Sequence, residues 1–166
     1  VSYCESEKIS YDQVVQLRNI TDGDLGAAIQ IRKEGEFTID LFNSFSSWMR
    51  ITYKTDVKEI SNWVDKISLQ GRKQQKLFLA YSIKMVRECL IYNFADHDLL
   101  KTNENEHAFL TKFAPFIHEE NSVLITEKLE TSIKAINRNA NAKILFFELS
   151  LQMVKFLKLK RKFAVK

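Results

Sequence analysis

Glycine and proline are scarce in this chain, and their scarcity restricts the folds open to it more than any other feature. The 166 residues include 4 Gly and 1 Pro. A β-rich fold needs many tight turns, and tight turns recruit Gly, Pro, Asn and Asp. With 45% hydrophobic residues, the chain is long enough to bury a substantial core. The composition therefore predicts an all-α fold, a bundle of a few long helices.

Apolar residues recur at helical spacing along the chain, most clearly over residues 57–67. Asp56, Asn103 and Asn141 stand where capping residues begin a helix, and Glu follows the first two at the third position. The predicted helices span residues 11–20, 24–33, 37–53, 57–67, 73–94, a short segment after Asn103 that ends before Pro115, 118–137 and 142–160.

The predicted helices 73–94 and 142–160 are apolar on more than one face. A helix that is apolar nearly all round is a central one, and a bundle of this size has difficulty burying two of them. We therefore expect a partner subunit to cover part of both helices. The interface residues that this hypothesis predicts are Leu77, Tyr81, Met85, Phe146, Phe147, Leu151, Met153 and Val154.

The sequence contains no phosphate-binding loop, nucleophile elbow, HExxH pair or CxxC pair. Asp96, His97 and Asp98, with His107 nearby, are metal-ligand types, but a solvated loop between helices is the favoured interpretation. His118 precedes two glutamates and is interpreted as a capping or surface residue rather than an acid–base catalyst. We predict no catalytic residue, no metal site and no cofactor.

Cysteine usage and hydropathy bear on the compartment. Cys4 and Cys89 are too few for a disulfide scaffold, so we expect a reducing cytoplasm. Cys89 lies in an apolar helical pattern and is expected in the core. No apolar run reaches the roughly 20 residues of a membrane helix, and no signal peptide is recognisable. The chain begins with Val1, which suggests a piece of a longer protein.

Basic residues concentrate at the end of the chain, although the net charge is only +4. From Lys155 onward no acidic residue interrupts them. A nucleic-acid-binding module that grips phosphates is therefore the alternative function. The favoured interpretation is a helix C-terminus, whose dipole is complemented by cations. The candidate DNA contacts are Lys158, Lys160, Arg161 and Lys162.

Several stretches are similar to a known family. Residues Lys112–His118, Ile136–Met153 and Gln70–Tyr81 resemble the C-terminal collar domain of bacterial clamp-loader subunits, in particular the delta-prime subunit of the DNA polymerase III holoenzyme. Residues Ile20–Ile29 resemble the last helix of an AAA+ lid. This resemblance divides the chain into a lid remnant, residues 1–35, and a helical collar or oligomerisation domain, residues 36–166.

The lid-like segment departs from the ATP-using members at one position. Their pattern is GxxRxA, in which the arginine contacts the nucleotide phosphates. Gly23 and Ala28 match the pattern here, but Gly26 stands at the arginine position. A residue without a side chain cannot stabilise phosphate charge. The resemblance therefore implies a subunit that does not sense ATP through this lid.

The resemblance also implies partners. The chain would join the other clamp-loader subunits, delta and gamma or tau, in a heteropentamer held together by the C-terminal domains. Through that complex it would meet the sliding clamp and primed DNA, while other subunits hydrolyse ATP. An AAA+ core would precede Val1.

Overall fold

The computed structural model describes residues 40–95 and 97–160, which form helices joined by short connecting segments. The chain divides into two units, Val1–Thr38 and Ile39–Lys166, and every described residue belongs to the second. The predicted helices 11–20 and 24–33, the lid remnant and Gly26 lie outside the described residues. In the described part there are six α-helices and two 3₁₀ turns, with no strand, so the all-α prediction is confirmed there. The elements are α4 (Leu41–Lys54), α5 (Val57–Ser68), α6 (Arg72–Phe94), η1 (His97–Leu99), α7 (Glu104–Phe113), η2 (Ala114–Phe116), α8 (Glu119–Asn137) and α9 (Ala142–Leu157).

Side-chain caps begin most of these helices, and the predicted caps are confirmed. The Asp56 carboxylate accepts a hydrogen bond from the Glu59 backbone N–H at 3.0 Å. Asn103 and Glu106 form a reciprocal capping box at the start of α7. Asn141 accepts from the third residue of α9 at 3.1 Å. Each of these bonds satisfies a backbone donor that the first turn of a helix leaves free.

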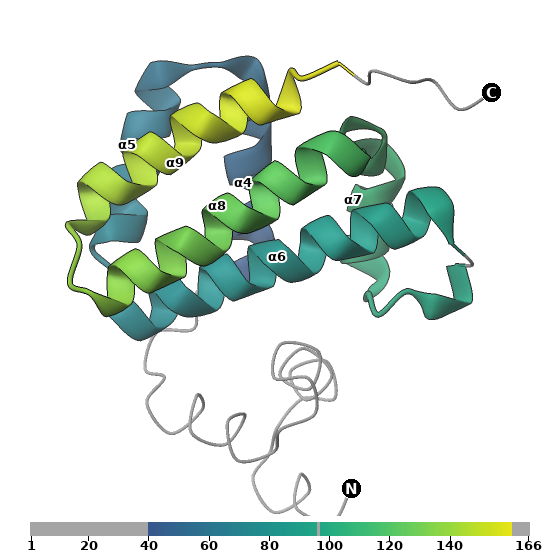
Figure 1. The fold of residues 1–166 in the computed structure, drawn as a ribbon, viewed down its shortest axis with the longest axis horizontal. Helices are drawn as coiled ribbons and strands as arrows, with labels where there is room; N and C mark the ends of the chain where they lie inside the picture. Colours follow the sequence, from purple (N-terminus) through teal and green to yellow (C-terminus); the bar gives the residue numbers. More distant parts are fainter. Residues whose placement is uncertain (1–39, 96, 161–166) are drawn as a thin grey trace, which may run out of the picture. The chain divides into compact units, whose positions relative to one another are not determined.

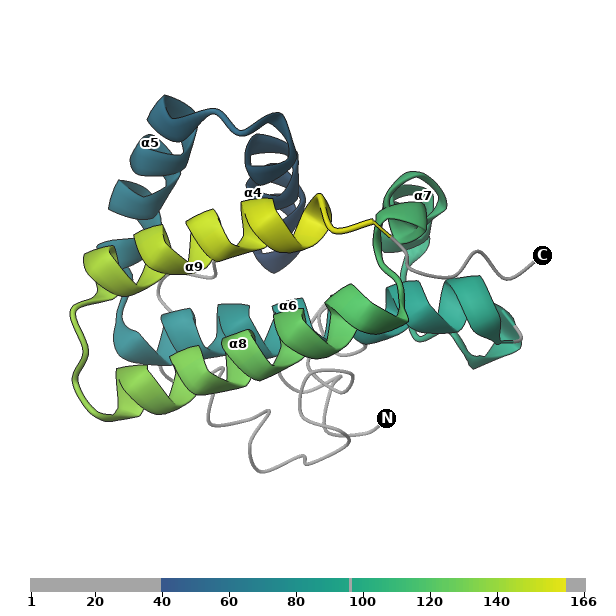
Figure 2. The same cartoon turned by 45° about the horizontal axis from the view of Figure 1, so that its top comes forward.

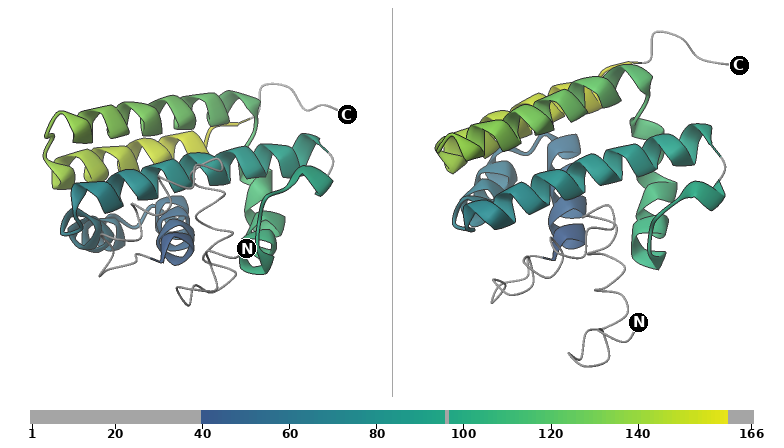
Figure 3. Two further views of the ribbon diagram at one scale, coloured as in Figure 1. Left: turned by 90° about the horizontal axis from the view of Figure 1, so that it is seen from below. Right: turned by 60° about the horizontal axis from the view of Figure 1, so that its bottom comes forward.

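Three helices, α6, α8 and α9, lie alongside one another, and α4, α5 and α7 cross them on one side (Figures 1 and 3). α6 and α8 are antiparallel. Lys76 near the start of α6 donates to Asn137 at the end of α8, while Asn93 near the end of α6 donates to the carbonyls of Ala114 and Ile117, just before α8. α9 packs against α4, α5 and α8 and passes across the first two (Figure 2).

An aromatic cluster joins four helices in the core. Trp48 of α4 stacks on Trp63 of α5, with ring centroids 5.3 Å apart. Phe78 of α6 and Phe146 of α9 complete the cluster, at 5.5 Å from Trp48 and 6.1 Å from Trp63 respectively. The indole N–H of Trp48 donates to the Ser150 hydroxyl at 2.8 Å, so the only polar atom of this ring is satisfied. This cluster fixes which face of α9 points inward.

α6 owes its wide apolar surface to its place between other helices. It packs against α4, α7 and α8. These neighbours bury Phe78, Leu79, Tyr81, Met85, Val86 and Cys89, while Leu77 is half-buried and Phe94 is 52% exposed. The expectation that a partner covers part of this helix is therefore corrected only for its buried residues, because other elements of the chain already cover them.

A buried carboxylate lies between α6 and α7. Glu106 is 1% exposed. Its carboxylate accepts hydrogen bonds from the Tyr81 hydroxyl at 2.6 Å, the Lys84 ammonium at 3.0 Å and the Asn103 backbone N–H at 3.1 Å. All its acceptor sites are used by three donors, one of them charged, so the desolvation cost of the carboxylate is offset by its bonds.

We expect Glu106→Ala to lower the free energy of unfolding by about 3–5 kcal/mol, because it leaves the Lys84 charge without its partner and removes the capping box. Urea denaturation followed by far-UV circular dichroism measures the change. Glu104→Ala, on the exposed side of the same first turn, is the matched control and should cost less than about 1 kcal/mol. Equal losses in the two variants would contradict a structural role for the buried carboxylate.

Candidate interaction surface on helix α9

The eight predicted interface residues divide into two groups. Tyr81, Met85, Phe146 and Met153 are buried in the chain's own core. A partner cannot reach them, so the structure corrects the prediction for these four. Leu77, Phe147 and Val154 are half-buried, and Leu151 is 38% exposed. These four residues remain accessible to a partner.

Three of the accessible residues lie on one side of α9, and a residue that the sequence analysis missed joins them. Ile144 is 70% exposed although it is apolar and lies in the first turn of the helix. Ile144, Phe147, Leu151 and Val154 alternate at spacings of three and four residues. At about 100° per residue this spacing keeps all four within one narrow face. We call these four residues the α9 stripe.

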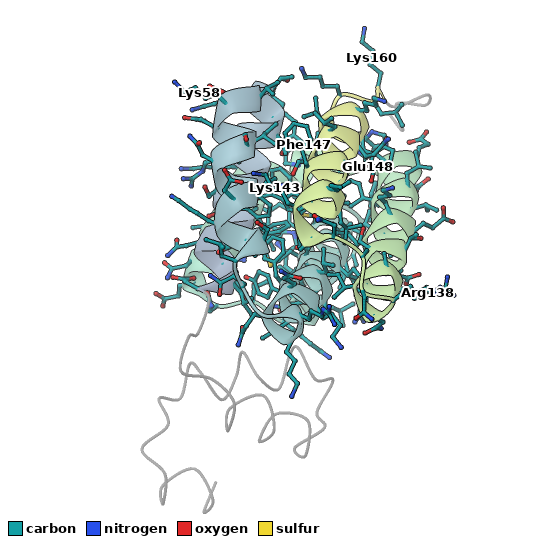
Figure 4. All side chains as sticks on the ribbon, turned by 90° about the vertical axis from the view of Figure 1, so that its left-hand side faces the viewer. Lys58, Arg138, Lys143, Phe147, Glu148 and Lys160 are labelled. Atoms are coloured by element: carbon teal, nitrogen blue, oxygen red, sulfur yellow. The ribbon has the colours of Figure 1, made fainter. Side chains whose placement is uncertain are left out.

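Ion pairs border the α9 stripe on both sides. Lys143 pairs with Asp65 of α5 at 2.6 Å, and Glu148 pairs with Lys128 of α8 at 2.8 Å. Figure 4 shows Lys143 and Phe147 beside α5 and Glu148 beside α8. The surface therefore has an apolar centre and a charged rim, the arrangement of protein–protein interfaces.

Other exposed apolar residues are more scattered. They are distributed over α4, α5, α6, η1, α8 and the segments that follow α5 and α9: Tyr53, Val57, Leu69, Phe94, Leu99, Val123, Leu124 and Leu159. Single exposed apolar side chains are ordinary on protein surfaces. The α9 stripe differs because its two exposed residues, Ile144 and Leu151, and its two half-buried residues, Phe147 and Val154, follow the period of a helix–helix contact.

The end of α9 is held by side chains from the start of α8. The Asn121 amide donates to the Phe156 carbonyl at 3.2 Å, and a ring nitrogen of His118 lies 3.0 Å from the Leu159 carbonyl. α9 ends at Leu157, slightly before the predicted end at about residue 160, and these side chains contact the carbonyls of its last turn and of the residues that follow. His118 also contacts Glu120 at 2.7 Å and is buried, so it is a cap residue but not a surface one.

Two of the four candidate DNA contacts at the basic end lie in the described residues. Lys158 and Lys160 are exposed, and the Lys158 ammonium donates to the Thr55 hydroxyl between α4 and α5. Arg161 and Lys162 lie outside the described residues. The described part of the basic end therefore includes one cation already engaged with a neighbouring turn.

The residues considered as metal ligands contact an aromatic ring. His97 stacks on Tyr92 with ring centroids 4.6 Å apart, and His107 approaches the same ring edge-on at 5.9 Å. Asp96 lies outside the described residues. In the described ranges, no three His, Cys, Asp or Glu side chains gather as a metal site would require. No described helix is long and apolar enough to cross a membrane.

Two buried acidic groups are held in their neutral forms. Burial raises the pKa of the Tyr81 hydroxyl, and the Glu106 carboxylate raises it further. Burial likewise raises the pKa of the Cys89 thiol, with a smaller contribution from Glu88. Nucleophilic chemistry needs the thiolate, so Cys89 is a core residue rather than a reactive one, as the sequence predicts.

The chain matches no protein-family model, no curated protein and no solved structure. The resemblance to clamp-loader subunits therefore rests on the residues quoted for it, and the interpretation of the surface rests on its geometry.

We expect Cys89 to resist a thiol reagent such as dithionitrobenzoate at pH 8 in the folded chain, because it is buried and its raised pKa keeps it protonated. Cys4, outside the described residues, is replaced by Ser so that one thiol is counted. One thiol should react promptly in 6 M guanidinium and at least a hundredfold more slowly without it. Prompt reaction of the folded chain would place Cys89 at an accessible site.

Proposed function

We propose that this chain is the C-terminal part of a clamp-loader subunit of the delta-prime type, and that its helical body is an assembly domain. In this role it holds neighbouring subunits of a heteropentamer together while the complex loads the sliding clamp onto primed DNA. The observation that carries the proposal is the α9 stripe, an apolar face with helix-pairing spacing whose residues Ile144 and Leu151 are exposed and whose residues Phe147 and Val154 are half-buried.

The size of the stripe supports a subunit of a larger ring better than a tight binary complex. Completing the burial of one large apolar side chain contributes at most about 1.5–3 kcal/mol. Association costs about 4–15 kcal/mol in lost freedom of motion. Ile144 and Leu151, the most exposed members, offset only part of that cost. A subunit that is bound by neighbours on two sides can depend on contacts this weak. Once the first neighbour is bound, the second contact forms within the same complex and no longer costs the full loss of free motion.

The alternative function is nucleic-acid binding by the basic end. Lys158 and Lys160 are exposed, which the alternative requires. However, Lys158 already binds Thr55, and the contact between His118 and Glu120 places a carboxylate near the Leu159 carbonyl. Carboxylates repel phosphate, so the described geometry favours the assembly domain.

The test of the proposal mixes this chain with the C-terminal domains of its sister subunits and measures sedimentation velocity. We expect a mixed complex, and we expect Ile144→Glu and Leu151→Glu to weaken it at least tenfold, since each places a charge in an apolar contact. Leu99→Glu is the control, because Leu99 is also exposed but lies in η1, and it should leave the complex unchanged.

Two outcomes would contradict the assembly domain. One is a chain that stays monomeric at high micromolar concentration in every mixture. The other is binding to primed DNA that falls steeply with salt and disappears when Lys158, Lys160, Arg161 and Lys162 become Ala, which would establish the nucleic-acid-binding module instead.

A further inference from the structure

Cations gather at the end of the bundle where α6 begins and α8 ends. The Lys76 ammonium of α6 donates to the Asn137 amide oxygen of α8 at 3.0 Å, and the Arg72 guanidinium donates to the amide oxygen of Asn139, just after α8. Figure 1 shows these two helix ends side by side. We call four cations of this end the α6–α8 basic patch: Arg72, Lys76, Lys134 and Arg138.

The two cations from α8 lie around the same asparagines. Arg138 stands between Asn137 and Asn139 in the chain, and Lys134 is four residues before Arg138. Residues four apart lie on the same face of a helix, so these two side chains are neighbours. Both are exposed, as is Arg72, and only Lys76 is half-buried. The patch is therefore one continuous positive surface that solvent reaches.

The charges of the patch have no acidic partner among the described residues. The two α6 cations bind neutral amide oxygens, and none of the described ion pairs includes a member of the patch. The sequence contains no Asp or Glu over residues 66–87 or 131–147. Because Asn137 and Asn139 turn their oxygens toward α6, their amide N–H groups add further donors. The patch thus offers positive charge together with hydrogen-bond donors.

Helix stability does not explain the α6 half of the patch. The N-terminal end of a helix carries a partial positive charge, which favours acidic side chains and disfavours basic ones. α6 has no acidic residue in its first turn, and it places Arg72, Lys73 and Lys76 in its first two turns. Lys134 and Arg138, at the C-terminal end of α8, are favoured by the dipole of their helix. An anion bound across the two helix ends would remove the repulsion in α6.

We propose that the α6–α8 basic patch binds the phosphate backbone of a nucleic-acid duplex without reading its sequence. Phosphate oxygens are negatively charged acceptors, and they complement a surface of cations and donors. A single strand is disfavoured, because residues 69–77 and 131–143 include no aromatic side chain on which unpaired bases could stack. An anionic bilayer is disfavoured too, because it would need an apolar face, whereas Leu69 alone is exposed in the connection before α6.

The patch is separate from the basic end of the chain. α9 begins after Asn141, beside the patch, and its 16 residues extend for about 24 Å before Lys158. Figure 4 shows Arg138 and Lys160 at opposite ends of the molecule. At 0.1 M salt, charges more than about 10 Å apart are largely screened from one another. The inference also uses no residue of the α9 stripe, so it does not rest on the proposed function.

Fluorescence anisotropy of a labelled DNA duplex of about 20 base pairs, mixed with the chain across a salt series, tests the proposal. Four phosphate contacts predict an association constant that falls about a hundredfold between 50 and 200 mM salt. Lys134→Gln combined with Arg138→Gln should lower the association constant at 100 mM salt at least tenfold and roughly halve the salt dependence. Neither side chain makes a described bond, so this variant should fold normally, which far-UV circular dichroism checks.

Lys158→Gln combined with Lys160→Gln is the matched control. It removes the same charge from the other end of α9, so the association constant should stay within twofold of wild type. Absent binding at 50 mM salt, or a loss in the control as large as in the patch variant, would overturn the proposal. Tighter binding of a single strand or of phosphatidylserine vesicles than of the duplex would overturn it as well.

Discussion

The hydrogen bond from the Trp48 indole to Ser150 determines which face of α9 is buried, and the candidate surface depends on it. Ser150 accepts from the indole and donates to the Phe146 carbonyl of its own helix at 2.7 Å. Both hydroxyl functions are thus used in a dry core, where an unpaired polar atom would cost about 1–3 kcal/mol. Any rotation of α9 that brought Ile144 inward would break this bond and withdraw Phe146 from Trp63 and Phe78. The exposure of the α9 stripe is therefore a consequence of core packing.

Local features of the fold could be read from the sequence because their causes are local. A cap joins residues three positions apart, so the caps of Asp56 with Glu59 and of Asn103 with Glu106 can be predicted from the sequence alone. The all-α fold class could also be predicted, because a chain with so few Gly and Pro cannot make the many tight turns of a β-rich fold. The end of α9 is different, because the donors on its last carbonyls are His118 and Asn121, 41 and 35 residues away.

The rotation of α9 about its axis could not be read in this way. Of the 16 residues of α9, 11 are apolar and they are spread around the helix, so its pattern has no single preferred face. Phe146 and Met153 were predicted at an interface and are in the core, while Ile144 was missed and is exposed. The deciding contact is with Trp48, 102 residues from Ser150. The spacing of three and four residues from Ile144 to Val154 indicates one apolar face of the helix. An equally regular series runs through Phe146, Leu149, Met153 and Leu157, so spacing alone does not show which of the two faces is buried.

Charged groups have two different roles in this molecule, and burial separates them. Between α6 and α7, Lys84 and Glu106 form a buried ion pair. Removing one partner leaves the charge of the other without a counter-charge in a poorly solvated place, which is strongly destabilising. On the rim of the α9 stripe, Glu148 and Lys143 remain partly solvated, so their ion pairs contribute little to stability. What solvated charges can do is discriminate between orientations and partners, because a like charge in the wrong place is repelled. An apolar stripe alone would accept any helix of suitable size. The charged rim therefore restricts which partner can pack on the stripe, and in which orientation.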